Sequence, residues 1–211
     1  FFIEAVRDHF GLSGGELGGT WRQRFHIDAR HWDGAGAPVF LYIGGEGTAN
    51  PPSERLFMAE LAKEHGALML VLEHRYYGES YPVPTMNRHQ LRLLSSTQAL
   101  ADLAWFISWV SSSSPNLTSA DPPLTLRASA KDSPWVAFGG SYPGNLAAWL
   151  KIKYPHLVVG SVSSSAPVQA EYNFEQYAQV VGSALANAEL GGGEACYSRV
   201  EEAVTLLRQL I

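Results

Sequence analysis

Short apolar segments recur along the first 165 residues of the chain, and segments with helical periodicity lie between them. Residues 39–43, 67–72, 135–138 and 157–162 have the length and composition of strands that are covered on both faces. Residues 21–28 alternate between apolar and polar side chains and are predicted to form an earlier strand. Strands that alternate with helices in this way form parallel sheets. The pattern therefore predicts an α/β fold with a mostly parallel sheet.

Three helices are predicted between these strands. The first starts at residues 50–53 and reaches about residue 65. Ser95 and Gln98 have the spacing of a capping box at the start of the second helix, whose apolar residues recur at helical intervals. The third helix follows Ser141 directly and extends to about residue 154.

The pattern changes after residue 167. Two helices are predicted, at residues 174–188 and 194–210, with three glycines and no strand between them. Two consecutive helices after a sheet strand are typical of a helical insertion over the sheet. We therefore predict the amino-terminal part of a sheet domain over residues 1–167 and the beginning of a helical cap over residues 168–211. The sequence stops inside an apolar helical pattern without a capping signal, as expected of a truncated domain.

Composition narrows the class of protein. With 46% hydrophobic and 17% charged residues, the 211-residue chain has the composition of a soluble globular protein. Its net charge of -5 argues against a nucleic-acid partner or an anionic membrane surface. No apolar run reaches the roughly 20 residues that a membrane span requires. The histidines other than His74 show no metal-ligand spacing and are interpreted as surface or packing residues, so neither a metal nor a cofactor is predicted.

The strongest chemical signal is the sequence Gly-Gly-Ser-Tyr-Pro-Gly at residues 139–144, where an apolar strand meets a helix. This is the arrangement of a nucleophile elbow, in which a sharp turn exposes a serine hydroxyl and small neighbours accommodate the strained backbone. Pro143 replaces the last glycine of the usual motif, and a helix tolerates proline in its first turn. Ser141 is therefore a candidate nucleophile. The alternative is a buried serine that caps the helix.

Two backbone N–H groups are candidates for an oxyanion hole. Tyr142 follows Ser141 at a helix N-terminus, where its N–H is placed to stabilise the charge of a tetrahedral intermediate. The second donor is expected from the glycine-rich loop at residues 44–47, at Gly45, because it follows a strand. An ordinary turn at the exit of that strand is the alternative.

Several motifs match one protein family together, in the same order and spacing. They are residues 73–80 (Glu-His-Arg-Tyr-Tyr-Gly-Glu-Ser), 94–102, 138–144, 154–157 and 163–168. On these motifs the chain resembles the serine peptidases that include lysosomal prolyl carboxypeptidase, its dipeptidyl peptidase relative and thymus-specific serine protease. It most resembles the thymus-specific member, because residues 44–47 lack the asparagine that prolyl-cleaving relatives carry before the glutamate.

The resemblance implies an α/β-hydrolase fold with a helical cap, and hydrolysis of peptide bonds, typically next to proline. It implies a lysosomal, endosomal or secreted protein that binds peptide substrates. A homodimer of the complete protein is a further expectation. Glu46 matches a residue that binds a free amino terminus in the dipeptidyl-cleaving relative, with an exposed loop carboxylate as the alternative. His74 and Arg75 are expected to be structural. Asn116 opens a glycosylation sequon, which favours the secretory route.

The chain lacks part of a catalytic triad. In α/β-hydrolases the order is serine, then an acid, then histidine. After Ser141 the chain contains no aspartate, and its only histidine is His156, at the end of the helix that follows the serine. We therefore expect the catalytic aspartate and histidine beyond residue 211, and these 211 residues alone to be inactive. A pseudoenzyme that binds peptides, or an esterase or lipase on the same fold, are the alternatives.

Overall fold

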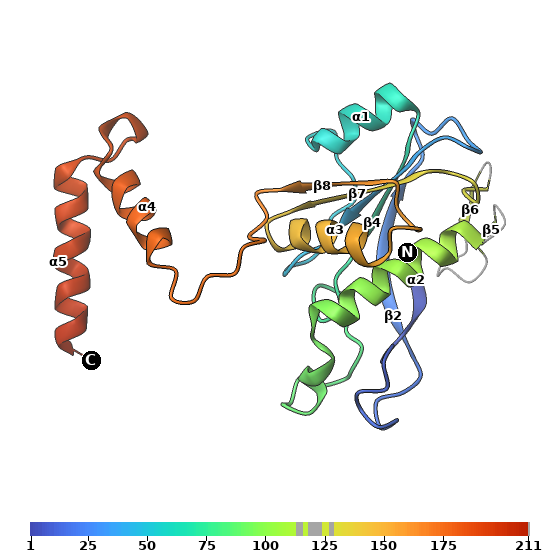
Figure 1. Ribbon diagram of the computed structural model, residues 1–211, viewed down its shortest axis with the longest axis horizontal. Helices are drawn as coiled ribbons and strands as arrows, with labels where there is room; N and C mark the ends of the chain where they lie inside the picture. The colour runs from blue at the N-terminus through green and yellow to red at the C-terminus, as the bar shows by residue number, and fades with distance from the viewer. Residues whose placement is uncertain (113–115, 118–123, 127–128, 211) are drawn as a thin grey trace. The chain divides into compact units, whose positions relative to one another are not determined.

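The computed structural model describes residues 1–112, 116–117, 124–126 and 129–210. It divides into two compact units, Phe1–Val168 and Gln169–Ile211. Figure 1 shows the first unit as a twisted sheet with helices on both faces.

A mixed six-stranded sheet forms the centre of the first unit. Its strands in spatial order are β1 (Phe2–Val6), β2 (Thr20–Asp28), β4 (Leu68–Leu72), β3 (Val39–Ile43), β7 (Trp135–Gly140) and β8 (Gly160–Ser164). The strands from β4 to β8 run parallel, whereas β2 pairs antiparallel with both β1 and β4. The predicted α/β class and mostly parallel sheet are therefore confirmed.

Helices cover the two faces of the sheet unequally. Helix α1 (Phe57–His65) packs Met58 and Ala62 against Phe40, Met69 and Phe138 on one face. Helices α2 (Ser96–Ser112) and α3 (Tyr142–Lys153) cover the other face, where most of the buried apolar residues lie. Alternate residues of each parallel strand point to opposite faces, so strands covered on both sides must be apolar throughout.

The remaining elements are short or belong to the second unit. They are η1 (Gln90–Leu93), β5 (Asn116–Leu117), β6 (Leu124–Thr125), α4 (Glu175–Ala186), η2 (Ala188–Leu190) and α5 (Glu194–Leu210). Helices α4 and α5 contact each other, but none of their residues is buried, and their apolar side chains stay largely exposed. The role of this unit as a cap stays a prediction.

Several predicted boundaries were wrong. Helix α1 begins at Phe57, because residues 53–56 form a separate turn closed by the Leu56 N–H and the Ser53 carbonyl at 3.0 Å, and Leu56 leaves it with the extended angles φ -82° and ψ 133°. Strand β8 begins at Gly160, because residues 154–157 form a turn closed by the Leu157 N–H and the Tyr154 carbonyl at 3.0 Å. Strand β1 was missed, since only two of its side chains, Ile3 and Ala5, are buried.

Candidate active site

Ser141 lies in the sharp turn between β7 and α3. Its backbone has φ 58° and ψ -132°, a left-handed conformation that is strained for any residue with a side chain. Its side chain is exposed and makes no capping hydrogen bond with the helix. On both counts Ser141 differs from a buried serine that caps the helix.

The elbow is tight enough to require two of its glycines. A Cβ atom on Gly139 would overlap the carbonyl group of Pro143 and lie 2.8 Å from the nitrogen of Gly144. One on Gly144 would lie 2.9 Å from the Cβ of Ala166. At Gly140, in contrast, the nearest atom would be the Ser164 carbonyl oxygen at 3.9 Å, an ordinary contact. The two strand-side glycines are therefore not equivalent.

Strand β8 and the residues after it hold one side of the elbow. The Ser141 N–H donates to the Ser164 carbonyl at 2.9 Å, and the Ser163 hydroxyl donates to the Gly144 carbonyl at 2.7 Å. The Asn145 side chain donates to the Pro167 carbonyl at 3.1 Å. These hydrogen bonds fix the first turn of α3 to the neighbouring strand.

The loop after β3 lies against the other side of the elbow. A Cβ atom on Gly45 would be 2.8 Å from the Cγ of Pro143, so the loop backbone approaches the residue directly after Tyr142. Glu46, the next residue, is exposed. Burial raises the pKa of Tyr142 to about 12, and the negative charge of Glu46 adds to that shift. The sequence-predicted residues Gly45, Glu46 and Tyr142 thus lie in one region around Ser141.

Glu73 holds this loop in place from the end of β4. Its buried carboxylate accepts hydrogen bonds from the Ala49 N–H at 2.9 Å, the Ser80 hydroxyl at 2.7 Å and the Glu79 N–H at 2.9 Å, and it pairs with Arg24. Burial alone raises the pKa of Glu73, but these hydrogen bonds outweigh it and keep the pKa below its ordinary value. One carboxylate therefore connects the loop after β3 with the turn after β4.

His74 connects the end of β4 with the elbow itself. Its Nδ1 lies 2.7 Å from the Arg75 carbonyl oxygen, and its Nε2 lies 3.0 Å from the Tyr142 hydroxyl. The residue is 5% exposed, and this burial lowers the pKa of its imidazole. His74, which was expected to be structural, therefore contacts the residue next to the candidate nucleophile.

Arg75 and Asp102 form a buried ion pair next to these residues. The guanidinium meets the carboxylate in two parallel contacts, Nε to Oδ2 at 2.6 Å and Nη2 to Oδ1 at 2.7 Å. Nη1 also donates to the Leu93 carbonyl at 3.0 Å and the Arg7 carbonyl at 3.2 Å. The pair joins the segment after β4 to α2, and Arg75 also contacts the segment after β1 and the last residue of η1, as the structural role predicted for Arg75 would require.

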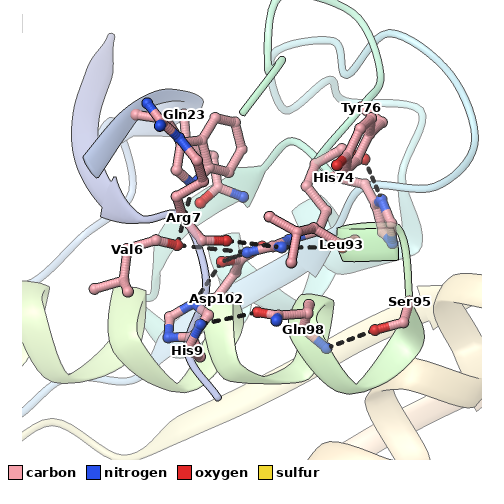
Figure 2. Close-up of polar contacts among 12 residues, drawn as sticks. Val6, Arg7, His9, Gln23, His74, Tyr76, Leu93, Ser95, Gln98 and Asp102 are labelled. Carbon is pink, nitrogen blue, oxygen red and sulfur yellow. Dashed lines mark hydrogen bonds and ion pairs between the residues drawn. The ribbon is translucent and has the colours of Figure 1, made fainter. Parts of the chain in front are cut away.

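Figure 2 shows that His9, Gln98 and Ser95 extend this polar cluster along α2. His9 Nε2 lies 2.7 Å from Asp102 Oδ1, so His9 is not a plain surface or packing residue. The Ser95 hydroxyl accepts from the Gln98 N–H at 3.3 Å, which confirms half of the predicted capping box. The Gln98 side chain instead donates to Asp8 at 2.8 Å and accepts from the His9 N–H at 3.1 Å.

Sequence reasoning missed Asp102, although a signal was present. Asp102 lies between Leu100 and Leu103 in the middle of a helix with an apolar face. A carboxylate in such a position is buried at a high cost unless a cation pairs with it. That cost identifies Asp102 as a residue with a buried partner, but the partner itself cannot be read from the spacing.

The other predicted features lie away from the elbow. His156 is exposed beyond the end of α3. The backbone of Asn116 is in β5, whereas Thr118 of its sequon lies outside the described residues, so glycosylation stays a prediction. In the part of the chain that the structure describes, no group of three or more histidine, cysteine or acidic side chains could hold a metal ion. No helix among those residues combines the length and hydrophobicity of a membrane span.

Known proteins resemble this chain in sequence and in fold. A model of the serine carboxypeptidase S28 family matches residues 6–211. Human thymus-specific serine protease is 40% identical over 204 residues, which are 96% of this chain and 36% of that protein. Human lysosomal Pro-X carboxypeptidase is 37% identical over 176 residues, which are 80% of this chain and 31% of that protein. The chain thus spans about a third of the length of these relatives.

Among solved structures, the protein Rv0554 from Mycobacterium tuberculosis superimposes with a TM-score of 0.53 at 14% identity. The match covers 87% of this chain and 52% of that one. At such low identity the likeness concerns the fold alone, which is that of the α/β-hydrolases. Because the family match covers nearly all of the sequence, the predicted resemblance is confirmed: the chain belongs to the S28 family of serine peptidases, which are hydrolases.

Proposed function

We propose that this chain is the amino-terminal part of a serine peptidase whose nucleophile is Ser141. The observation that carries the proposal is the exposed hydroxyl of Ser141 on a strained turn between β7 and α3. Strain at a single polar residue persists only where surrounding structure enforces it, and such positions concentrate at functional sites. The S28 family match supplies the reaction class, hydrolysis of peptide bonds.

In the proposed reaction, the Ser141 oxygen attacks the scissile carbonyl carbon while a histidine accepts the hydroxyl proton. The carbonyl oxygen becomes negatively charged and receives hydrogen bonds from the backbone N–H groups of Tyr142 and Gly45. The tetrahedral intermediate then expels the amine, which takes the proton from histidine, and leaves an acyl group on Ser141. Water removes that acyl group by the same steps. The histidine and its aspartate come from residues beyond this chain.

The substrate is proposed to be a peptide cut near one of its ends, next to proline. The name of the lysosomal Pro-X carboxypeptidase relative supports this preference and a lysosomal location. The exposed carboxylate of Glu46, whose charge acts on Tyr142, is the group proposed to bind the amino terminus of the peptide. Its position on the loop beside the elbow suits contact with a substrate rather than with the protein core.

A fluorophosphonate probe tests the nucleophile, because it labels a serine only when a neighbouring base activates it. The complete protein is expected to be labelled at Ser141, the Ser141→Ala variant to lose the label, and residues 1–211 alone to label at least a hundredfold more slowly. Equal labelling of the complete protein and of residues 1–211 would contradict the proposed origin of the base. A complete protein that takes no label would favour a peptide-binding pseudoenzyme.

Blocked peptides test the mode of cleavage. Proline-containing peptides with free ends, an acetylated amino end, an amidated carboxyl end or both blocks are compared for their rates of hydrolysis. An exopeptidase is expected to lose activity when the block covers the end that it recognises, and if Glu46 binds the amino terminus, acetylation has the larger effect. Undiminished cleavage of the doubly blocked peptide would refute the exopeptidase proposal.

The contact between Gly45 and Pro143 gives a prediction for the proposed oxyanion hole. A methyl group on residue 45 would collide with the rigid proline ring, so Gly45→Ala is expected to destabilise the protein by about 1 to 3 kcal/mol and to slow labelling of Ser141. Pro143→Ala removes the ring atoms of the collision, so the double variant is expected to recover most of both losses. Urea unfolding and labelling of the four proteins measure the coupling, and strictly additive effects would argue against it.

A further inference from the structure

The hydrogen bond between His74 and Tyr142 joins two segments that lie 68 residues apart in the sequence. One is the exit of β4, and the other is the first residue of the helix that follows Ser141. The imidazole also packs edge-to-face against two aromatic rings, Tyr142 at 5.5 Å and Tyr77 at 5.4 Å between centroids. The Tyr142 side chain is therefore held by contacts on its hydroxyl and on its ring.

The direction of this hydrogen bond follows from the other nitrogen of His74. The Arg75 carbonyl oxygen can only accept, so the Nδ1 atom at 2.7 Å must carry a proton. Burial lowers the pKa of His74, which favours the neutral ring, and a neutral ring protonated on Nδ1 has an unprotonated Nε2. The raised pKa of Tyr142 keeps its hydroxyl protonated. Tyr142 therefore donates its proton to His74 Nε2.

His74 is itself fixed by its neighbours in sequence. Glu73 is anchored by the Ala49 and Glu79 N–H groups, and Arg75 is anchored by the Asp102 carboxylate. Both flanking residues are fully buried. Because these three consecutive residues are held at both ends, the imidazole has little freedom to follow a displaced Tyr142. It is a rigid support.

That support bears on the chemistry because of where Tyr142 lies. The strained turn at Ser141 is followed directly by Tyr142, and the side chain of Ser141 contributes no capping bond to hold the start of α3. We propose, on the basis of the proposed function, that His74 is a positioning residue that fixes Tyr142 so that its backbone N–H stays directed at the oxyanion. Strand β8 holds the backbone groups of Ser141 and Gly144 on either side of Tyr142, so loss of the hydrogen bond to His74 frees Tyr142 rather than the whole first turn of α3. Small rotations of the Tyr142 peptide group then misalign the donor, and misplacement on the order of 1 Å can cost about a hundredfold in rate.

The test uses the complete protein and a fluorophosphonate, which forms an Oγ–P bond at Ser141 with loss of fluoride while the base takes the serine proton. Its phosphonyl oxygen occupies the proposed oxyanion hole, and its kinetics separate a limiting rate from a half-saturating concentration. Tyr142→Phe keeps the ring and the backbone N–H but removes the donor to His74. It is expected to lower the limiting rate about tenfold and to leave the half-saturating concentration unchanged.

Variants of both partners isolate the hydrogen bond. His74→Leu is expected to match Tyr142→Phe, His74→Gln to recover most of the rate because its amide oxygen accepts, and the double variant to be no slower than the worse single one. Tyr76→Phe is the matched control, because Tyr76 is a buried tyrosine whose hydroxyl donates instead to the Gln90 carbonyl. It is expected to leave the limiting rate within about twofold of the unaltered protein.

Nitrogen-15 NMR of His74 reads the hydrogen bond independently of activity. The unaltered protein is expected to show the Nδ1–H form, with an Nε2 resonance that moves in Tyr142→Phe but not in Tyr76→Phe. An Nε2–H form, additive rate losses, or equal rates for Tyr142→Phe and Tyr76→Phe would each overturn the role of His74 and leave the proposed function intact. An unaltered protein that takes no label would overturn the proposed function, and the positioning role with it.

Discussion

Replacing Asp102 with alanine is expected to lower the free energy of unfolding by about 3 to 5 kcal/mol. The change leaves the fully buried guanidinium of Arg75 without its carboxylate and removes the partner of His9 Nε2. A buried charge that loses its partner retains the cost of leaving water, and the protein interior offers no replacement. Urea unfolding of the complete protein measures the loss, with a lower midpoint at an unchanged slope.

A surface ion pair provides the control for this result. Asp28 contacts Arg30 at 2.6 Å, but the arginine side chain is 60% exposed. Arg30→Ala is expected to change stability little, because water and salt replace the lost interaction of this exposed side chain. Replacing Arg75 and Asp102 together with methionine and leucine is expected to recover part of the loss. If Asp102→Ala were no more damaging than Arg30→Ala, the buried cluster would not hold the first unit together.

Gly139→Ala and Gly140→Ala are expected to differ sharply, although the two glycines are adjacent. A methyl group at residue 139 would overlap the carbonyl group of Pro143, which belongs to the backbone of the helix start and cannot turn aside. The elbow must then open, and labelling of Ser141 by a fluorophosphonate is expected to fall at least about a hundredfold. A methyl group at residue 140 would meet only the Ser164 carbonyl oxygen, at 3.9 Å.

Thermal unfolding of both variants separates a local opening of the elbow from global loss of the fold. We expect Gly139→Ala to lower the melting temperature as well as the labelling rate, and Gly140→Ala to leave both close to those of the unaltered protein. Comparable labelling of the two variants would show that the elbow adapts, and the crowding at Gly139 would then not be required for the exposed serine.

The pattern of apolar and polar residues along the chain was enough to predict the strands and helices that form the centre of the fold. Residues 39–43 and 68–72 are apolar at every position because helices cover both faces of their strands. The turn at Ser141 was also visible, since glycines before and after a serine at a strand–helix junction are typical of a nucleophile elbow. The ends of the helices and strands could not be predicted from this pattern alone. The start of α1, for example, depends on the path of the chain after β3 rather than on the residues of the helix.

Contacts between distant segments could not be predicted in the same way. Asp102 pairs with residues 27 and 93 positions away, and Gln98 gives up its local capping partner for Asp8. A capping rule predicts which hydrogen bond a side chain prefers within its own helix turn. It does not predict which distant residue will compete for that side chain in the folded protein. A side chain is excluded at Gly139 but not at Gly140 because the start of α3 packs closely against β7 at only one of the two positions. The spacing of residues in the sequence does not show this packing.

The hydrogen bonds that hold the turn at Ser141 also determine when its backbone conformation can form during synthesis of the chain. The acceptor for the Ser141 N–H is the carbonyl of Ser164, and the Gly144 carbonyl receives the hydroxyl of Ser163. Ribosomes add residues from the amino end, so both partners emerge about 20 residues after the serine. A nascent chain that ends between residues 141 and 163 therefore contains the nucleophile without the complete strand that holds it in place, and the backbone of Ser141 is held in its strained conformation only after β8 has joined the sheet.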